Sequence, residues 1–446
     1  MRILLWFIVF VLITADTFSL ELGLAPGLSA KNALLYLAAV FLAGRFIITR
    51  TFKVQLGGVH AAFLILVTYA VITLFVAAYG IAYPRYKFLE SAMFLKGNLV
   101  DHYLFFAVFF FGPRTRDEAL SVIKALIVAA CAANFITVVD ASGLIHLGVT
   151  EVGQDGRVQG AMGEQNQYGA YIIAFLPAML AYAISGRGAM RAVWLLAAMI
   201  SLAALLMTAS RGAMVGLIFS AVWGAYLFRR YLSPEKVIIW GLSAFVLISV
   251  VVAMLSLQFG DLLKEHVLQG TFTNNATEAS SGRTELWGPA FSLLMSHPWA
   301  LITGFCWDAY AHLLTSVTHN HYLDLWFNLG LIGLFAFLFI LIRVCIFARS
   351  TCEIATPAVR AQLIAFVFGL IAVAGAIFFV NLYSPWPYIW AYIGATMRLA
   401  IEERSASAAS QSSAIRQARE ATPAAGVRRG AVRKPSPALS SGRGQF

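Results

Sequence analysis

Charged residues are scarce in this sequence. Asp, Glu, Lys and Arg make up 12% of its 446 residues, against 60% hydrophobic residues and a mean hydropathy of +0.79. Cysteine is also rare, and the four cysteines are scattered without close pairs, so neither a disulfide framework nor a zinc site is indicated. Because a soluble globule cannot be packed from this composition, we expect a polytopic membrane protein.

Long apolar runs recur along nearly the whole chain. A run of about 20 residues can cross the hydrocarbon core, where only helices satisfy the backbone without long-range strand pairing. The sequence therefore predicts an all-α transmembrane domain over residues 1–401 with about twelve spans. The predicted spans lie near residues 3–20, 31–48, 57–79, 95–111, 118–138, 166–184, 192–209, 212–228, 236–257, 322–342, 361–380 and 385–401.

Two regions fall outside this pattern. Residues 258–321 form the longest connection, a large loop between the ninth and tenth spans. Residues 402–446 change abruptly to Ser, Ala, Arg and Pro, which predicts a disordered basic tail. Such a tail either contacts anionic lipid headgroups or acts as a positive-inside determinant.

Short loops rich in Lys and Arg set the orientation. They follow the second, fourth, sixth, eighth and tenth predicted spans, and all of them lie on one side, which is the cytoplasm by the positive-inside rule. Both termini then face the cytoplasm, and residues 139–165 and 258–321 lie outside. The first segment has no clear signal-peptidase site after residue 14, so we interpret it as an uncleaved anchor.

Arg211 is an exception to this charge pattern. It lies in Ser210-Arg211-Gly212, between two apolar runs, on the predicted outer side. A tight helical hairpin there, with Gly212 allowing the chain to reverse, places the arginine beside the N-terminus of the next helix. The arrangement predicts a phosphate-binding site, and the alternative is an interfacial anchor.

The large outer loop adds further candidates. Gly282-Arg283 is followed by Trp287, and the aromatic and apolar pattern up to Gly304 favours helices lying along or dipping into the membrane surface. His319 falls at the outer mouth of the next span, and it is either a functional residue or a hydrogen-bonded structural one. The predicted outer segments contain no Asp-rich cluster suited to Mg²⁺ or Mn²⁺, so we expect no metal and no cofactor.

The order of these motifs resembles a known family. Ser210-Arg211-Gly212, Gly282-Arg283 with Trp287, His297-Pro298 with Gly304, and His319-Asn320 leading to Gly330 and Gly333 look like the successive blocks of the O-antigen ligase and Wzy-type polymerase family. Arg157 with Gly160 and Asn166 is similar to an earlier block, so the resemblance covers roughly residues 150–345.

The resemblance implies a GT-C-like glycosyltransferase of the bacterial inner membrane that uses no metal. Members move a glycan from an undecaprenyl-pyrophosphate carrier to an acceptor hydroxyl, which belongs to a glycan, lipid A core or another molecule. Arg211 and Arg283 would clamp the pyrophosphate as catalytic residues, with Arg157 assisting. His319 would accept the proton of the attacking hydroxyl or bind pyrophosphate as a cation.

The remaining family positions imply substrate contacts by Asn320, Tyr322 and Asn166, although Asn320 could instead cap the helix end. Phe327-Asn328-Leu329 stands where many members carry an acidic residue, which bears on the identity of the acceptor. A ligase and a polymerase share these blocks. The alternative function is a multi-span transporter or flippase of an anionic or lipid-linked substrate. A lipid bilayer is the expected surroundings, and no nucleic-acid partner is expected.

Overall fold

The computed structural model describes residues 1–231 and 282–421, apart from 21–22, 26, 51–54, 154 and 315, together with isolated residues between 232 and 281. It divides into two compact units, Met1–Arg404 and Ser405–Phe446. The predicted ninth span at 236–257 and the first part of the outer loop lie outside the described residues. So do residues 422–446 of the tail.

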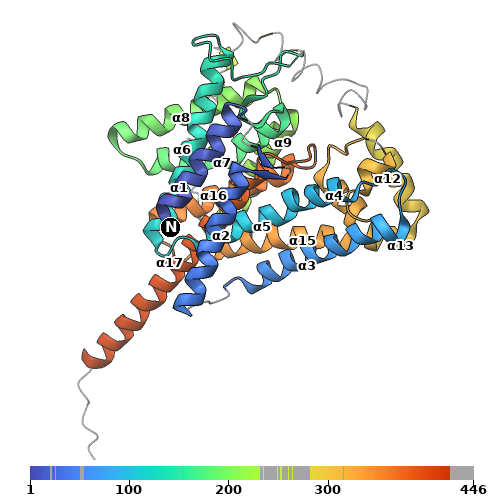
Figure 1. Ribbon diagram of the computed structural model, residues 1–446. Helices are drawn as coiled ribbons and strands as arrows, with labels where there is room; N and C mark the ends of the chain where they lie inside the picture. The colour runs from blue at the N-terminus through green and yellow to red at the C-terminus, as the bar shows by residue number, and fades with distance from the viewer. Residues whose placement is uncertain are drawn as a thin grey trace, which may run out of the picture. The chain divides into compact units, whose positions relative to one another are not determined.

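The described chain is helical, as the composition predicts (Figure 1). One small antiparallel pair, β1 (Gly23–Ala25) and β2 (Leu28–Ser29), interrupts it. The first half contains α1 (Arg2–Thr17), α2 (Ala30–Thr49), α3 (Gly57–Phe75), α4 (Phe88–Leu95), α5 (Asp101–Phe111), α6 (Arg116–Ala141), α7 (Gln165–Ser185), α8 (Gly188–Met207) and α9 (Arg211–Leu227). The second half contains α12 (Arg283–Ser296), α13 (Pro298–Thr303), α14 (Ala309–Leu314), α15 (His321–Thr351), α16 (Pro357–Ala376) and α17 (Trp386–Ala421). Three shorter turns are η1 (Val76–Ile81), η2 (Lys96–Val100) and η3 (Gly160–Met162).

Eight helical stretches among the described residues are long and apolar enough to cross a membrane. They are Ala30–Thr49, Gly57–Ile81, Phe88–Phe111, Arg116–Ala141, Gln165–Ser185, Gly188–Met207, His321–Thr351 and Pro357–Ala376. The polytopic all-α fold is confirmed, while the count of twelve spans and the GT-C-like arrangement stay predictions. α9 is a shorter apolar helix of 17 residues, and α1 has 16 residues.

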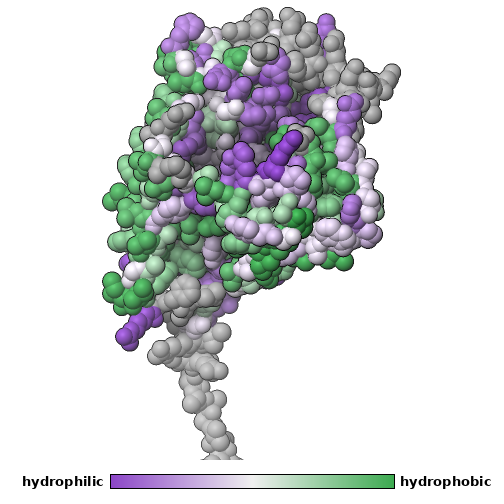
Figure 2. Space-filling view, turned by 45° about the vertical axis from the view of Figure 1, so that its right-hand side comes forward, coloured by the Kyte–Doolittle hydropathy of each residue, from purple (hydrophilic) through white to green (hydrophobic). Residues whose placement is uncertain are grey.

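The surface of the helices fits a lipid environment. Large apolar side chains are exposed on several of the candidate spans, for example Ile48 at 83% and Leu64 at 67%. Figure 2 shows hydrophobic residues over much of the lower part of one face, while hydrophilic residues gather around a recess in its upper part. A soluble monomer rarely exposes so much contiguous apolar surface.

Close helix contacts depend on small residues. α16 packs against both α7 and α9. A Cβ added to Gly216 of α9 would lie 2.9 Å from the backbone N of Ala376 in α16. Small residues at such crossings let the two backbones approach, which is a common device in membrane helices.

The outer loop forms a second, smaller core beside the start of α15. α12, α13, α14 and α15 bury a cluster of their own, consisting of Ala290, Leu294, Ala300, Phe305, Ala309, Tyr310, Leu323 and Phe327. α15 is kinked at Gly330 (φ 63°, ψ −167°). A Cβ on Gly330 would overlap the carbonyl group of Ile302, so this glycine allows α13 to sit against the kink.

The tail differs from its prediction. α17 continues as a helix to Ala421, although the sequence predicts disorder from residue 402. No glycine or proline occurs between Gly394 and Pro423, and the intervening Ala, Ser, Gln and Arg residues are compatible with a helix. The predicted boundary at residue 401 falls close to the boundary between the two compact units at Arg404.

Candidate functional site

The turn between α8 and α9 positions Arg211. Ser210 is the N-cap of α9, and its Oγ accepts a hydrogen bond from the backbone N of Ala213 at 3.4 Å. Arg211 is therefore the first residue of the helix, at the end where backbone N–H groups favour an anion. The chain reverses at Ala209 (φ 45°) and not at Gly212, because Gly212 already lies inside α9.

Arg157 is held against the same turn. The backbone N of Val158 donates to the Met207 carbonyl at 3.1 Å, which ties the loop before α7 to the end of α8. The Arg157 Nε then donates to the Thr208 carbonyl at 2.9 Å and its Nη2 to Asn166 Oδ1 at 3.0 Å. Because the guanidinium group is planar, these two hydrogen bonds fix the orientation of the Arg157 side chain.

Asn166 connects these pieces. Its Oδ1 also accepts from Ser210 Oγ at 3.1 Å, and its Nδ2 donates to Glu164 Oε1 at 2.6 Å. Glu164 in turn caps α7 by accepting from the backbone N of Gln167 at 2.8 Å. In this geometry Asn166 orients Arg157 and Ser210, and direct contact between Asn166 and a substrate stays a prediction.

Arg283 approaches from the outer loop. It is the first residue of α12, and its Cζ lies 5.9 Å from the centroid of the Phe379 ring. Phe379 also packs against α9, because a Cβ on Gly212 would lie 2.7 Å from the Phe379 Cβ. Burial, and then the positive charges of Arg211 and Arg157, lowers the pKa of Arg283. The three guanidinium groups are thus close enough to repel one another.

His319 joins the same group. Its backbone is left-handed (φ 49°), and the residue before it is anchored by Trp287 Nε1, which donates to the Thr318 carbonyl at 2.7 Å. Burial lowers the pKa of His319, and the charge of Arg283 lowers it further, whereas Glu164 raises it. The imidazole is therefore neutral at neutral pH and can accept a proton.

Asn320 and Tyr322 occupy structural positions at the start of α15. Asn320 Oδ1 accepts from the backbone N of Tyr322 at 3.1 Å and of Leu323 at 3.0 Å, which is the helix-capping alternative. Tyr322 Oη donates to the Ala374 carbonyl at 2.6 Å and so links α15 to α16. A contact of either residue with substrate stays a prediction.

The structure therefore brings Arg157, Arg211, Arg283 and His319 together from four separate segments. Sequence reasoning missed Glu164, Phe379 and Thr318, which support these groups. Glu164 gives only a partial signal, since acidic residues favour the N-terminal end of a helix but Glu is not a preferred N-cap residue. Phe379 gives no local signal, because its contacts with Gly212 and Arg283 exist only in the folded chain.

The groups gathered here are guanidinium groups and a helix N-terminus, beside an imidazole. Guanidinium forks and a helix N-terminus suit phosphate oxygens. Within residues 1–231 and 282–421, as far as they are described, no group of three or more His, Cys, Asp or Glu side chains is placed to hold a metal ion. The donors that converge here are arginines.

One family model matches part of the chain. Residues 196–338 match the model of a family described as O-antigen ligase. The matched segment contains Arg211, Arg283, His319, Asn320 and Tyr322, while Arg157 and Asn166 precede it. No curated protein matches the chain. Over residues 196–338 the chain is therefore similar to the O-antigen ligase family.

Proposed function

We propose that this protein is a membrane glycosyltransferase that moves a glycan from undecaprenyl pyrophosphate to an acceptor hydroxyl. The observation that carries this proposal is the convergence of Arg157, Arg211 and Arg283, with His319 beside Arg283. Their mutual repulsion is relieved by a multiply charged anion, and a pyrophosphate diester supplies that charge.

The transfer is a substitution at the anomeric carbon of the donor sugar. The acceptor oxygen forms a bond to C1 while the bond from C1 to the pyrophosphate oxygen breaks, and the electron pair leaves with the pyrophosphate. His319 takes the proton of the acceptor hydroxyl, which its lowered pKa and neutral form permit. Arg211 and Arg283 neutralise the charge that develops on the leaving oxygen, and Arg157 completes the clamp.

No metal is required in this scheme, because guanidinium groups take the place of a divalent cation. The positive-inside pattern supports a site at the periplasmic face of the bacterial inner membrane, with both termini in the cytoplasm. A GT-C-like arrangement of about twelve spans is consistent with the helices described. Ligase and polymerase use the same donor chemistry and differ in the acceptor.

The test is transfer by purified protein in the presence of excess EDTA. Lipid-linked glycan from a deletion strain serves as donor, and release of undecaprenyl pyrophosphate with extension of the acceptor is the expected result. Activity that is lost in EDTA and restored by Mg²⁺ would refute the arginine clamp. The same strain distinguishes the two reactions, because a missing polymerase leaves single repeat units on the lipid and a missing ligase leaves long chains.

A further inference from the structure

The segment that joins α13 to α14 is held by tyrosines from the first half of the chain. Every second carbonyl along this segment accepts a hydrogen bond from a tyrosine hydroxyl. The bonds are Tyr69 Oη to Thr303 at 2.6 Å, Tyr83 Oη to Phe305 at 2.9 Å and Tyr86 Oη to Trp307 at 2.7 Å. The outer loop is thereby fixed to the elements around α3 and α4.

This segment has an unusual backbone. Cys306 (φ 82°) and Asp308 (φ 62°) both adopt the left-handed conformation, which is disfavoured for residues that carry a Cβ. Such residues persist where the surroundings over-determine them, and they gather at functional sites. The hydrogen bonds from the three tyrosines hold the backbone in this conformation, and the backbone in turn orients the Asp308 carboxylate.

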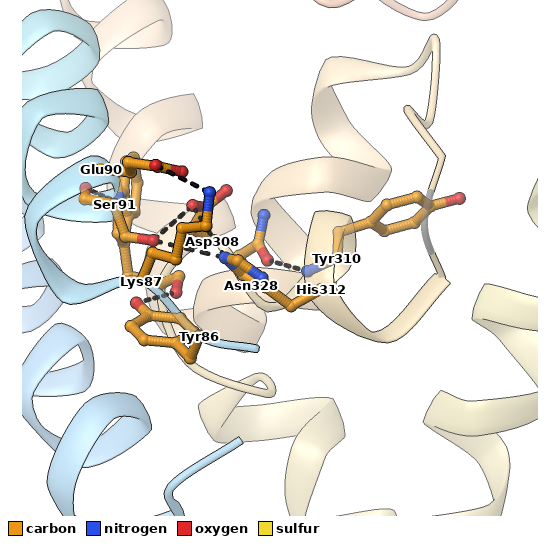
Figure 3. Close-up of polar contacts among 9 residues, drawn as sticks. Tyr86, Lys87, Glu90, Ser91, Asp308, Tyr310, His312 and Asn328 are labelled. Atoms are coloured by element: carbon orange, nitrogen blue, oxygen red, sulfur yellow. Dashed lines mark hydrogen bonds and ion pairs between the residues drawn. The ribbon is translucent and has the colours of Figure 1, made fainter. Parts of the chain in front are cut away.

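Asp308 lies at the centre of a polar cluster (Figure 3). Ser91 Oγ of α4 donates to Asp308 Oδ2 at 2.6 Å, and the His312 Nε2 of α14 lies 3.5 Å from the same oxygen. The Tyr86 ring is 4.8 Å from the His312 ring. The side chains of Asp308 and His312 remain 18% and 17% exposed, so substrate can reach them. Ser91 is fully buried and serves to hold Asp308, which excludes it as a nucleophile.

Hydrogen bonds and shared packing connect this cluster to the segments that carry Arg283 and His319. Tyr310 of α14 donates from its Oη to the Leu286 carbonyl at 3.0 Å, and Leu286 lies on the first turn of α12, which begins at Arg283. Trp287 of the same helix bonds the Thr318 carbonyl next to His319. α12 and α14 share the small core of the outer loop. One helical layer therefore carries both Arg283 and His312.

We propose that Asp308, His312 and Tyr86 bind a sugar ring of the acceptor glycan. A carboxylate accepts hydrogen bonds from sugar hydroxyls, an imidazole can donate or accept one, and an aromatic ring packs against the apolar face of the sugar. This subsite rests on the proposed function, since it supposes an acceptor that carries sugar hydroxyls. It shares no residue with the groups proposed to bind pyrophosphate, so donor and acceptor contacts are separable by substitution.

The experiment measures transfer by the full-length protein at saturating donor while the acceptor varies. The acceptor probe is the oligosaccharide that mild acid releases from the envelope glycolipids of the deletion strain. For Asp308→Asn we expect the acceptor KM to rise about tenfold or more. The hydrogen bonds from the sugar hydroxyls then end on a neutral amide instead of a charged carboxylate. The kcat and the inhibition constant for undecaprenyl pyrophosphate should stay within about twofold of wild type. Asp117→Asn is the matched control, since Asp117 is an exposed carboxylate in the first turn of α6, outside this cluster, and it should leave the acceptor KM unchanged.

A merely structural role for Asp308 predicts that Asp308→Asn lowers kcat and the melting temperature and leaves the acceptor KM unchanged. That result would overturn the subsite. If Asp308→Asn does not fold, His312→Gln gives the same test from the other side of the cluster. Direct binding of the oligosaccharide, monitored by tryptophan fluorescence, tests the acceptor subsite independently of the proposed transferase function. Binding by the wild type that Asp308→Asn weakens supports the subsite even if the donor proves not to be a pyrophosphate. Absence of binding, or equal binding by both proteins, overturns it.

Discussion

Replacing Arg211 or Arg283 by lysine tests whether these side chains bind phosphate through paired N–H groups or act only through their positive charge. Lysine retains the positive charge but presents a single ammonium group, so it cannot contact two phosphate oxygens in one plane. Arg283 also lies over the Phe379 ring at 5.9 Å, a contact that orients its guanidinium.

The size of the expected effect can be estimated from other water-poor active sites in which one hydrogen-bond donor to the transition state was removed. Loss of one preorganised donor costs about 2.7–4 kcal/mol of transition-state stabilisation, which corresponds to about 100–1,000-fold in rate. We expect Arg211→Lys and Arg283→Lys each to fall in this range, with the loss mainly in kcat. His319→Ala should be similarly defective, because the acceptor proton then has no positioned acceptor.

The assay is glycan transfer by each variant at matched abundance in the membrane. Arg191→Lys is the control, because Arg191 is exposed at the start of α8 and lies on the predicted cytoplasmic side. It should transfer at nearly the wild-type rate. Near-normal transfer by both Arg211→Lys and Arg283→Lys would show that the arginines are interfacial anchors, and the clamp would then have no physical basis.

Three further predictions concern pH, packing and topology. Since burial and Arg283 lower the pKa of His319, transfer should fall with decreasing pH only below the ordinary histidine pKa of about 6.5. Glu164→Gln removes a charge that raises this pKa, so the acid limb should move to lower pH, and a limb that moves upward contradicts His319 as the base. Gly330→Ala should destabilise the protein by roughly 2–5 kcal/mol, through its positive φ and the overlap with Ile302, as a thermal melt can show. Gly288→Ala, where a Cβ meets nothing within 4 Å, should be neutral or mildly stabilising. In spheroplasts of a variant without native cysteines, Leu144→Cys should react with an impermeant maleimide and Ser440→Cys should not, while a reactive tail refutes the proposed orientation.

The helices could be predicted from the sequence because a membrane span is a local property. Length and apolar composition decide it, and the predicted span at 192–209 corresponds to α8 (Gly188–Met207). The start of α9 at Arg211 was also readable, since Ser210 is a good N-cap residue and follows an apolar run. The position of the reversal was not, because the left-handed residue is Ala209, a residue with no turn preference.

The relations within the site could not be predicted in the same way. The pairing of Arg157 with Asn166, and of both with the α8–α9 turn, depends on a backbone contact between Val158 and Met207 that are far apart in the sequence. The kink of α15 at Gly330 similarly depends on contact with Ile302. Glycine spacing alone indicates a special backbone at such positions but does not say which segment fills the space.

Two carboxylates stand close to the arginines of the site, Asp155, whose Oδ2 lies 3.8 Å from Arg157 Nη1, and Glu164. Glu164 raises the pKa of Arg157, Arg283 and His319, so it offsets part of the repulsion in the folded protein. Both of its oxygens are already engaged, by Asn166 Nδ2 and by the backbone N of Gln167. Glu164 therefore offsets part of the positive charge while both of its oxygens are bound within the protein. Under the proposed function, a pyrophosphate would meet an Arg157 guanidinium that its bonds to Thr208 and Asn166 already hold, so little reorganisation would be needed when charge develops on the leaving oxygen.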